Sequence, residues 1–464
     1  MNKQKHDSIY YLEKAPISKA IAHMSIPMIL GMVVSIICNI TDAYFIGMMN
    51  STPMMAGVTL AMPFTAILLM AFGNIFGIGG GTYIARLLGE NDIEGSKKAS
   101  SVNFYFSLLT GLLVAIIGLL LISPILQMLG AGGDTWEYTR EYLMVFVLSA
   151  PIIITNFMLI QTVRGEGASK ESMIGMVIAV VVNIALDPLF IFTFGWGIAG
   201  AAWATVLGNL CSLIYYIWFL KKHSKVQSVA IQDCKPTLNM LANILKIGIS
   251  AFLLDGFLLV SSVMFNNYSM LYGESVVAGF GIAQRTVQLA DLIGMGLYMG
   301  VLPLLAYTYS AGNYIRLKEI IRKTTIYLVA ITGGITLSLF LFRIQLLQLF
   351  SIDAEVITIG SYILIALLAS TLFACFAGMY SSIFQAFGKG IQANTMSIMR
   401  GVVIIPIIIL GNKWFELDGV IWSITASDAL ACVIGFILYC GLGYKKGMLQ
   451  TVAVETKDGK TSVL

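Results

Sequence analysis

The stretch AIAHMSIPMILGMVVSIICNITDAYFIG, from Ala20 to Gly47, is long enough to cross a membrane and contains a single acidic residue. A helix of about 20 predominantly apolar residues spans the hydrocarbon core of a bilayer. Comparable apolar stretches recur along the chain, near 20–47, 56–84, 99–122, 136–160, 171–194, 197–220, 243–268, 276–306, 324–343, 356–380, 391–411 and 418–443. The sequence therefore predicts an all-α integral membrane protein of about twelve transmembrane helices.

The composition supports a membrane protein and excludes several other classes. Of 464 residues, 58% are hydrophobic and 11% are charged, whereas soluble domains carry about 25% charged residues. A net charge of +4 on so apolar a chain does not suggest nucleic-acid binding. The six cysteines are never spaced as CxxC, which disfavours a structural zinc site or a disulfide framework. No HExxH, P-loop or GxSxG motif occurs, so we expect neither an enzyme nor a cofactor.

The distribution of Lys and Arg predicts the orientation of the helices. If the N-terminus is cytoplasmic, most of the 28 basic residues fall in cytoplasmic connections, as the positive-inside rule requires. The apolar run after the basic N-terminus has no A-x-A-like cleavage site, so we expect no removable signal peptide. We therefore expect a multi-pass protein of the bacterial cytoplasmic (inner) membrane with both termini in the cytoplasm.

A weak internal repeat indicates two homologous halves. AGVTLA at Ala56 recurs as AGFGIA at Ala278, and GAAWAT at Gly200 recurs as GVIWSI at Gly419. The longest polar connection, KKHSKVQSVAIQDCKPTLN, lies between these halves. Repeats of this kind place a transport path at their interface. The predicted division is a cytoplasmic N-terminus (1–19), an N-lobe (20–220), a cytoplasmic linker (221–242), a C-lobe (243–443) and a cytoplasmic tail (444–464).

Two acidic residues within the predicted helices indicate a site. A carboxylate at the bilayer centre costs about 2.5–3.5 kcal/mol, a cost usually tolerated for a function. Asp42 lies in the first helix and Asp187 in the fifth; Asn183 shares a helix face with Asp187, and Thr205 follows in the sixth helix. In the second half, the positions that correspond in the repeat to Asp42, Asn183 and Asp187 are occupied by the apolar residues Met264, Ile404 and Ile408.

This asymmetry predicts an ion site in the N-terminal half. Two carboxylates, an amide and a hydroxyl are hard oxygen ligands, which suit Na⁺, or H⁺ if one carboxyl is readily protonated. A bound Na⁺ would thus lie at Asp42, Asn183, Asp187 and Thr205. The alternative is that both acids lie near helix ends, where they contact water or cap backbone groups.

The chain resembles the multidrug and toxic compound extrusion (MATE) family, in its DinF-like, MepA-like bacterial branch. The resemblance rests on Asp42, on GGGTYIARLLGEND from Gly79, on VRGEGASK from Val163 and on NIALDPLFIFTFGWGIAGAAWAT from Asn183. It implies a V-shaped fold that exports drug-like organic cations in exchange for H⁺ or Na⁺ by alternating access.

The resemblance also implies roles for individual residues. In that branch, an Asp of the first helix, an Asn and an Asp of the fifth and a Thr of the sixth form a cation site; here these match Asp42, Asn183, Asp187 and Thr205. A first-helix proline, matched by Pro27, is the expected conformational hinge.

Other candidate residues are less specific. Asp255 in the seventh helix is either a second acid site or part of an interhelical salt bridge. For Arg285 and Asp291 we expect buried pairing with other helices, Arg400 or Asp428 among the candidates, and for the segment of Arg164, Glu166, Lys170 and Glu171 a solvated turn. Candidates for a substrate cavity, each otherwise ordinary packing, are Met264, Tyr268, Phe280 and Tyr298.

Rival functions remain open at this level. We expect a monomer that transports small organic, cationic substrates. The first alternative is a flippase or exporter of a lipid-linked or metabolite substrate within the same superfamily. A major facilitator is disfavoured because its basic GxxxDRxGRR-like loop is absent between helices two and three. A receptor or scaffold would leave the intramembrane acids without a purpose.

Overall fold

The computed structural model describes residues 8–49, 51–62, 64–65, 69–351 and 353–445, and all the regular elements in these ranges are helices. Helices satisfy backbone hydrogen bonds within one segment, which a lipid environment demands. The first half contains α1 (Ser8–Glu13), α2 (Ile17–Gly47), α3 (Thr52–Met62), α4 (Leu69–Gly89), α5 (Ile93–Leu120), α6 (Ile122–Met128), α7 (Thr135–Leu148), α8 (Ala150–Gly165), α9 (Ser169–Pro188), η3 (Leu189–Thr193) and α10 (Gly197–Lys222). After η4 (Ile231–Asp233), the second half contains α11 (Leu238–Met270), α12 (Glu274–Gly300), α13 (Leu302–Ser310), α14 (Tyr314–Leu341), α15 (Arg343–Gln348), α16 (Ala354–Ala386), α17 (Gly390–Gly401) and α18 (Ile404–Lys445).

The helices account for the twelve predicted spans. In the described ranges, nine helical segments are long and apolar enough to cross a membrane, or ten with the pair α7 and α8, which are bent by 58°. The pair α3 and α4, on either side of a short stretch outside the described residues, covers the second predicted span. The last of the nine, 390–442, is 53 residues long and covers two predicted spans.

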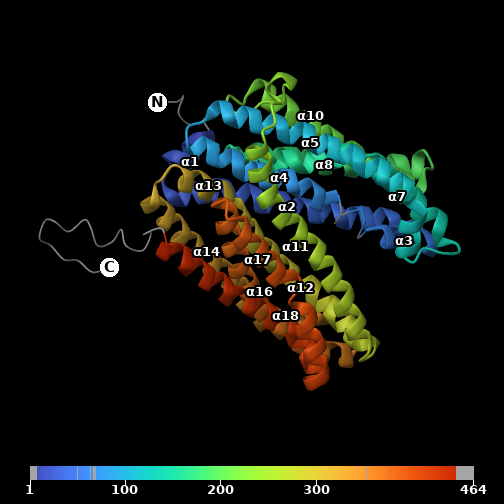
Figure 1. Ribbon diagram of the computed structural model, residues 1–464. Coiled ribbons are helices and arrows are strands. Elements are labelled where there is room, and N and C mark those ends of the chain that lie inside the picture. Colours follow the sequence, from blue (N-terminus) through green and yellow to red (C-terminus); the bar gives the residue numbers. More distant parts are fainter. Residues whose placement is uncertain (1–7, 50, 63, 66–68, 352, 446–464) are drawn as a thin grey trace, which may run out of the picture.

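Helix α18 reverses direction at Glu416. That residue has φ 52° and ψ −129°, which is not helical. In one straight helix, Gly411 and Gly419 would lie about 12 Å apart. Here their backbones touch, because a Cβ on Gly419 would clash with the carbonyl oxygen of Gly411. The reversal separates one span, made of α17 and the first part of α18, from an antiparallel second one, and it places the end of the described chain at the same end of the molecule as α1 (Figure 1).

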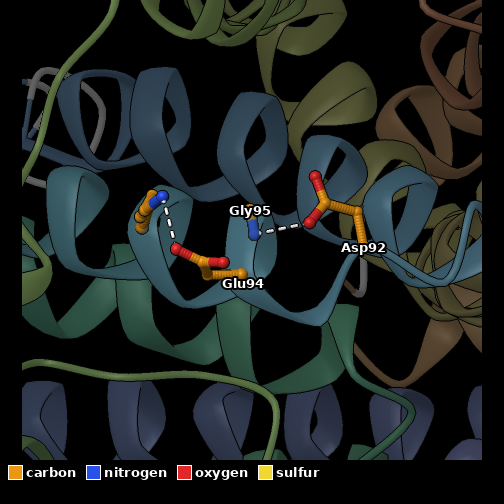
Figure 2. Close-up of polar contacts among 4 residues, drawn as sticks. Asp92, Glu94 and Gly95 are labelled. Atoms are coloured by element: carbon orange, nitrogen blue, oxygen red, sulfur yellow. Dashed lines mark hydrogen bonds and ion pairs between the residues drawn. The ribbon is translucent and has the colours of Figure 1, made fainter.

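The two halves repeat in their turns as well as in their helices. Asp92 caps α5 by accepting a hydrogen bond from the backbone N–H of Gly95 (2.8 Å), beside an ion pair of Glu94 (Figure 2). Asn313 caps α14 by accepting from the N–H of Arg316 (3.0 Å). Such caps satisfy backbone donors that a helix leaves unpaired at its start. The same local chemistry therefore begins the third span of each half.

The helices form two bundles in a V. Figure 1 shows α2 to α10 and α11 to α18 lying together near α1 and α13 and diverging toward α3 and α7. Helix α4 packs against α11, and α2 packs against α12. A Cβ on Gly79 would clash with the Ile244 carbonyl, and one on Gly248 with the Ile75 carbonyl. Glycine allows this close backbone approach, which is typical of helix packing in membranes.

Two local expectations differ from the structure. The segment before the first span contains the short helix α1, and α2 begins at Ile17. The prediction of a solvated turn after Val163 was wrong for Arg164 and Glu166, which are each only 2% exposed, whereas Lys170 is exposed and Glu171 is half-buried. Arg164 donates to the Met28 sulfur and to the Gln161 side chain, and Ser224 donates to Glu166. The connection from α10 folds back over this end, because Gln227 donates to the Thr162 carbonyl.

Candidate ion site

The first, fifth and sixth spans bring the four predicted ion-site residues together. Asp42 lies in the last two turns of α2, Asn183 and Asp187 in the last turns of α9, and Thr205 in α10. Pro188 follows Asp187 directly and lacks a backbone N–H, and the π-helical turn η3 begins at the next residue. Such irregular turns often mark functional sites in helices.

Asn183 links the carboxylate of the first span to the hydroxyl of the sixth. In the amide orientation that satisfies its neighbours, its NH₂ group donates to Asp42 Oδ1 (2.9 Å) and its carbonyl accepts from Thr205 Oγ1 (3.2 Å). Asn183 is 2% exposed, whereas Asp42 and Thr205 are half-buried. The amide therefore fixes the Asp42 carboxylate relative to α10, and the partly exposed side remains open to an ion.

Asp187 is the least satisfied member of the group. It is 0% exposed, and no hydrogen-bond donor among the described residues reaches either of its carboxyl oxygens. Its neighbour is the Asp42 carboxyl, close enough for the two groups to share a hydrogen bond. Two carboxyls can be joined in that way only when one of them carries a proton. The arrangement therefore needs a proton or another cation between two acids.

Two further residues belong to this environment and were not predicted. Cys38 lies one turn before Asp42, with its sulfur 2.9 Å from the Asn183 amide and 3.9 Å from Asp42 Oδ1. Tyr142 of α7 is 8% exposed and lies near both Asp42 and Asp187. The i, i+4 spacing of Cys38 and Asp42 was a usable signal in the sequence. Nothing local in the sequence indicates Tyr142, because α7 approaches the site only in the folded bundle.

Helix α2 connects this site to the other bundle. Pro27 lies inside α2, 15 residues before Asp42, which is about 22 Å along a helix. Next to Pro27, Ser25 donates to the Leu297 carbonyl of α12 (3.2 Å), and a Cβ on Gly296 would clash with Ile29. The same helix thus carries one acid of the site and part of the contact between the bundles.

Asp255 does not join the ion site. It is half-buried in α11, where its carboxylate accepts a hydrogen bond from Asn74 of α4 (3.0 Å). No ion pair of Asp255 occurs among the described residues. Asp255 therefore forms a hydrogen bond between the two bundles, and the alternative of an interhelical salt bridge is not formed among the described residues.

Most of the remaining candidates lie around the second bundle. A cavity of about 430 Å³ there is lined by Tyr298, Asp291, Arg400 and Asp428, among others. Phe280 is 5% exposed and packs edge to face on Phe265, a lining residue. Met264, Tyr268 and Arg285 are not among the lining residues, and Arg285 is exposed. Asp291, Arg400 and Asp428 of the charged set thus line one cavity, but the expected pairing is not formed as an ion pair among the described residues, and Arg285 lies outside the cavity.

Fold and site together define a class: a polytopic α-helical membrane protein of two six-span bundles, with paired carboxyls inside one of them. The profile of the MatE family matches residues 27–189 and, a second time, residues 247–410. These two matches coincide with the two halves of the repeat. The chain belongs to the MatE family of membrane transporters.

Individual relatives agree with this assignment. The multidrug export protein MepA of Staphylococcus aureus (strain MRSA252) is 38% identical over 434 residues, which cover 94% of this chain and 96% of that protein. A multidrug resistance MATE transporter solved in an outward-facing conformation is 26% identical, with a TM-score of 0.87 over 96% of this chain and 99% of that one. A Pyrococcus furiosus transporter of the same superfamily, described as having a binding pocket of reverse polarity, is 26% identical with a TM-score of 0.86, over 95% of this chain and 98% of that one.

Proposed function

We propose that this protein exports small organic cations by alternating access, in exchange for H⁺ or Na⁺ bound between Asp42 and Asp187. The observation that carries the proposal is the closeness of the half-buried Asp42 carboxyl to the fully buried Asp187 carboxyl, in a position whose counterpart in the other bundle is apolar. Two acids held together out of water are unfavourable without a cation between them. The amide and hydroxyl oxygens of Asn183 and Thr205 fit Na⁺ as well as they fit a protonated pair.

The coupling follows from the position of α2. Binding of a cation would draw Asp42 toward Asp187 and so change the position of the end of α2 relative to α9. The other end of α2 contacts α12 through Ser25 and Leu297. Pro27 lacks the N–H that would bond the His23 carbonyl, so α2 bends most easily at this point, beside its contact with α12. We infer that α2 bends at Pro27 as the ion enters or leaves.

Exchange requires that ion and substrate oppose each other. If ion binding favours one arrangement of the bundles and substrate binding the other, each lowers the apparent affinity of the other by the same factor. We propose that residues 20–220 and 243–443 move as the two lobes. The V opens away from the end that holds α1 and the end of α18, so cytoplasmic termini would make this conformation outward-facing (Figure 1). We propose a monomer in the bacterial cytoplasmic membrane.

A second candidate is the export or flipping of an anionic lipid-linked or metabolite substrate. The relative with a pocket of reverse polarity shows that this superfamily includes such variation in charge. The cavity of the second bundle here contains two acids and one base. This excess of negative charge favours a cationic substrate.

Transport into proteoliposomes tests the proposal. The purified protein is reconstituted, and uptake of the fluorescent cation ethidium is followed under an imposed pH gradient and, separately, under an imposed Na⁺ gradient. One of the two gradients should drive uptake against the ethidium gradient. Uptake under neither gradient, with an anionic dye transported instead, would refute the proposal.

A further inference from the structure

The cavity of the second bundle is separate from the ion site. It lies among α11, α12, α16, α17 and α18, and none of the described residues of the first bundle lines it. Its volume of about 430 Å³ is within the range of small-molecule binding sites, about 300–1,000 Å³. A single dehydrated ion would leave such a volume almost empty. The cavity therefore has the size for an organic molecule.

The two bundles differ at corresponding positions around these sites. In the repeat, Asn183 corresponds to Ile404, and Thr205 corresponds to Ile424 by the offset between Gly200 and Gly419. Both isoleucines line the cavity. The polar residues that hold the ion site together thus have apolar counterparts in the second bundle. Where the first bundle has a compact polar cluster, the second has a cavity with isoleucines at the corresponding positions.

Three charged residues line this cavity together with neutral polar and apolar ones. Ser370 donates to Asp428 Oδ2 (2.6 Å), and Arg400 lies near Tyr298 and Asp428. Asp291 lies near Thr371. No ion pair among the described residues joins Arg400 to either acid. With one base facing two acids, the cavity has one negative charge in excess when all three are ionised.

Asp291 is the acid that the cavity presents to a ligand. It lines the cavity from α12 on the same helix face as Gln284 and Gln288, and all three are exposed, whereas Asp428 is half-buried. A second, independent feature also indicates a missing polar partner. Ser427 lines the cavity, is 2% exposed, and its hydroxyl has no hydrogen-bond partner among the described residues. Buried polar groups are normally satisfied, by protein, water or ligand.

We propose that this cavity binds a lipophilic organic cation, with Asp291 as the counter-ion of its charged group. The apolar wall, including Phe265, Ile404 and Ile424, would contact the lipophilic part. Asp428 stays balanced by Arg400, which leaves Asp291 free for the ligand. This inference rests on the proposed function and adds that substrate and coupling ion occupy different bundles.

Binding to the purified full-length protein tests the site. Ethidium affinity is measured by fluorescence for the native protein, Asp291→Asn and Glu274→Gln. Glu274 is the matched control, an exposed acid in the first turn of the same helix. Removing a charge-assisted contact should weaken ethidium binding about tenfold or more in Asp291→Asn. Glu274→Gln should bind as the native protein does.

The outcomes separate this inference from the proposed function. Unchanged binding in Asp291→Asn, or a loss of the same size in Glu274→Gln, would overturn the cavity as the binding site even if gradient-driven uptake persists. Absence of gradient-driven uptake by the native protein would instead refute the proposed function.

A second measurement does not depend on the folding of Asp291→Asn. Gln288→Cys places a thiol in the cavity wall with all three charged residues intact. Ethidium should slow maleimide modification of this thiol, followed by mass spectrometry, and leave the rate at Cys440 on α18 unchanged. Cys440 is exposed and does not line the cavity. Equal rates at position 288 with and without ethidium would contradict the inference.

Discussion

The two bundles share one plan of helices, yet they place their charged residues on different elements. In the first bundle the acids are on α2 and α9, the first and fifth spans, and they touch each other. In the second bundle they are on α12 and α18, the second and sixth spans, with Arg400 nearby. The first arrangement encloses a small polar site, and the second surrounds a cavity of about 430 Å³.

This difference shows that the repeat preserves packing and leaves the chemistry of each half free to vary. Caps at Asp92 and Asn313 and the close glycine contacts between helices are features of the fold. Asp187 and its counterpart Ile408 are both 0% exposed, so the same buried position is acidic in one bundle and apolar in the other. A buried acid without a structural equivalent in the other half is best explained by function.

The largest expected effect is on transport. Asp42→Asn and Asp187→Asn each leave a side chain that cannot release a proton or offer a full negative charge to a cation. Gradient-driven ethidium uptake in proteoliposomes should therefore fall to the background of empty vesicles. Glu274→Gln serves as the control and should transport normally. If both aspartate variants took up ethidium at the native rate, the acids of the first bundle would have no special role in transport.

Asp187 and Ile408 occupy corresponding positions in the repeat, and giving each position the residue of the other should have opposite effects on the stability of the protein. Ile408→Asp puts an unpaired carboxylate into a fully buried apolar position and should destabilise the protein by about 3–5 kcal/mol. Asp187→Ile removes one of two adjacent acids, so we expect unchanged or higher stability together with loss of transport. Thermal unfolding in detergent measures both. Equal melting temperatures for Ile408→Asp and the native protein would show that this position tolerates charge.

The contact between the bundles should respond to a smaller change. Asn74→Leu removes the donor to Asp255 and leaves a half-buried carboxylate unpaired, a cost of about 1–3 kcal/mol to the arrangement seen here. Distances between spin labels on the two bundles should shift toward a second population. Asn243→Leu is a suitable control, because Asn243 of α11 is half-buried and its side chain bonds to Asn239 of its own helix. An unaltered distance distribution in Asn74→Leu would exclude a role for this contact in gating.

The smallest effects should be equal in the two halves. Asp92→Ala and Asn313→Ala each remove one helix cap, and each should lower stability by about 1 kcal/mol. Asp134→Ala is the matched control, because Asp134 precedes α7 without making a cap hydrogen bond. Unequal losses measured by thermal unfolding would mean that the two bundles do not share the same local stability.

Sequence alone was sufficient for the spans because their length and apolarity are local properties. Twelve stretches of about 20 apolar residues are visible in the chain, and the structure accounts for all of them. The acids of the ion site were also visible, because a charge within an apolar run stands out and the second half lacks it. The boundaries, the environment of Arg164 and the burial of Arg285 were misjudged, since the packing of a residue against distant segments leaves no local pattern.

Tertiary structure decided which distant residues meet. The approach of Tyr142 to the two acids depends on how α7 packs, and the hydrogen bond between Asn74 and Asp255 joins residues 181 positions apart. The cavity of the second bundle draws its lining from five helices, of which no single one reveals it. Periodicity and composition report what a helix can bury, whereas the angle and rotation at which helices pack determine what each buried face contacts.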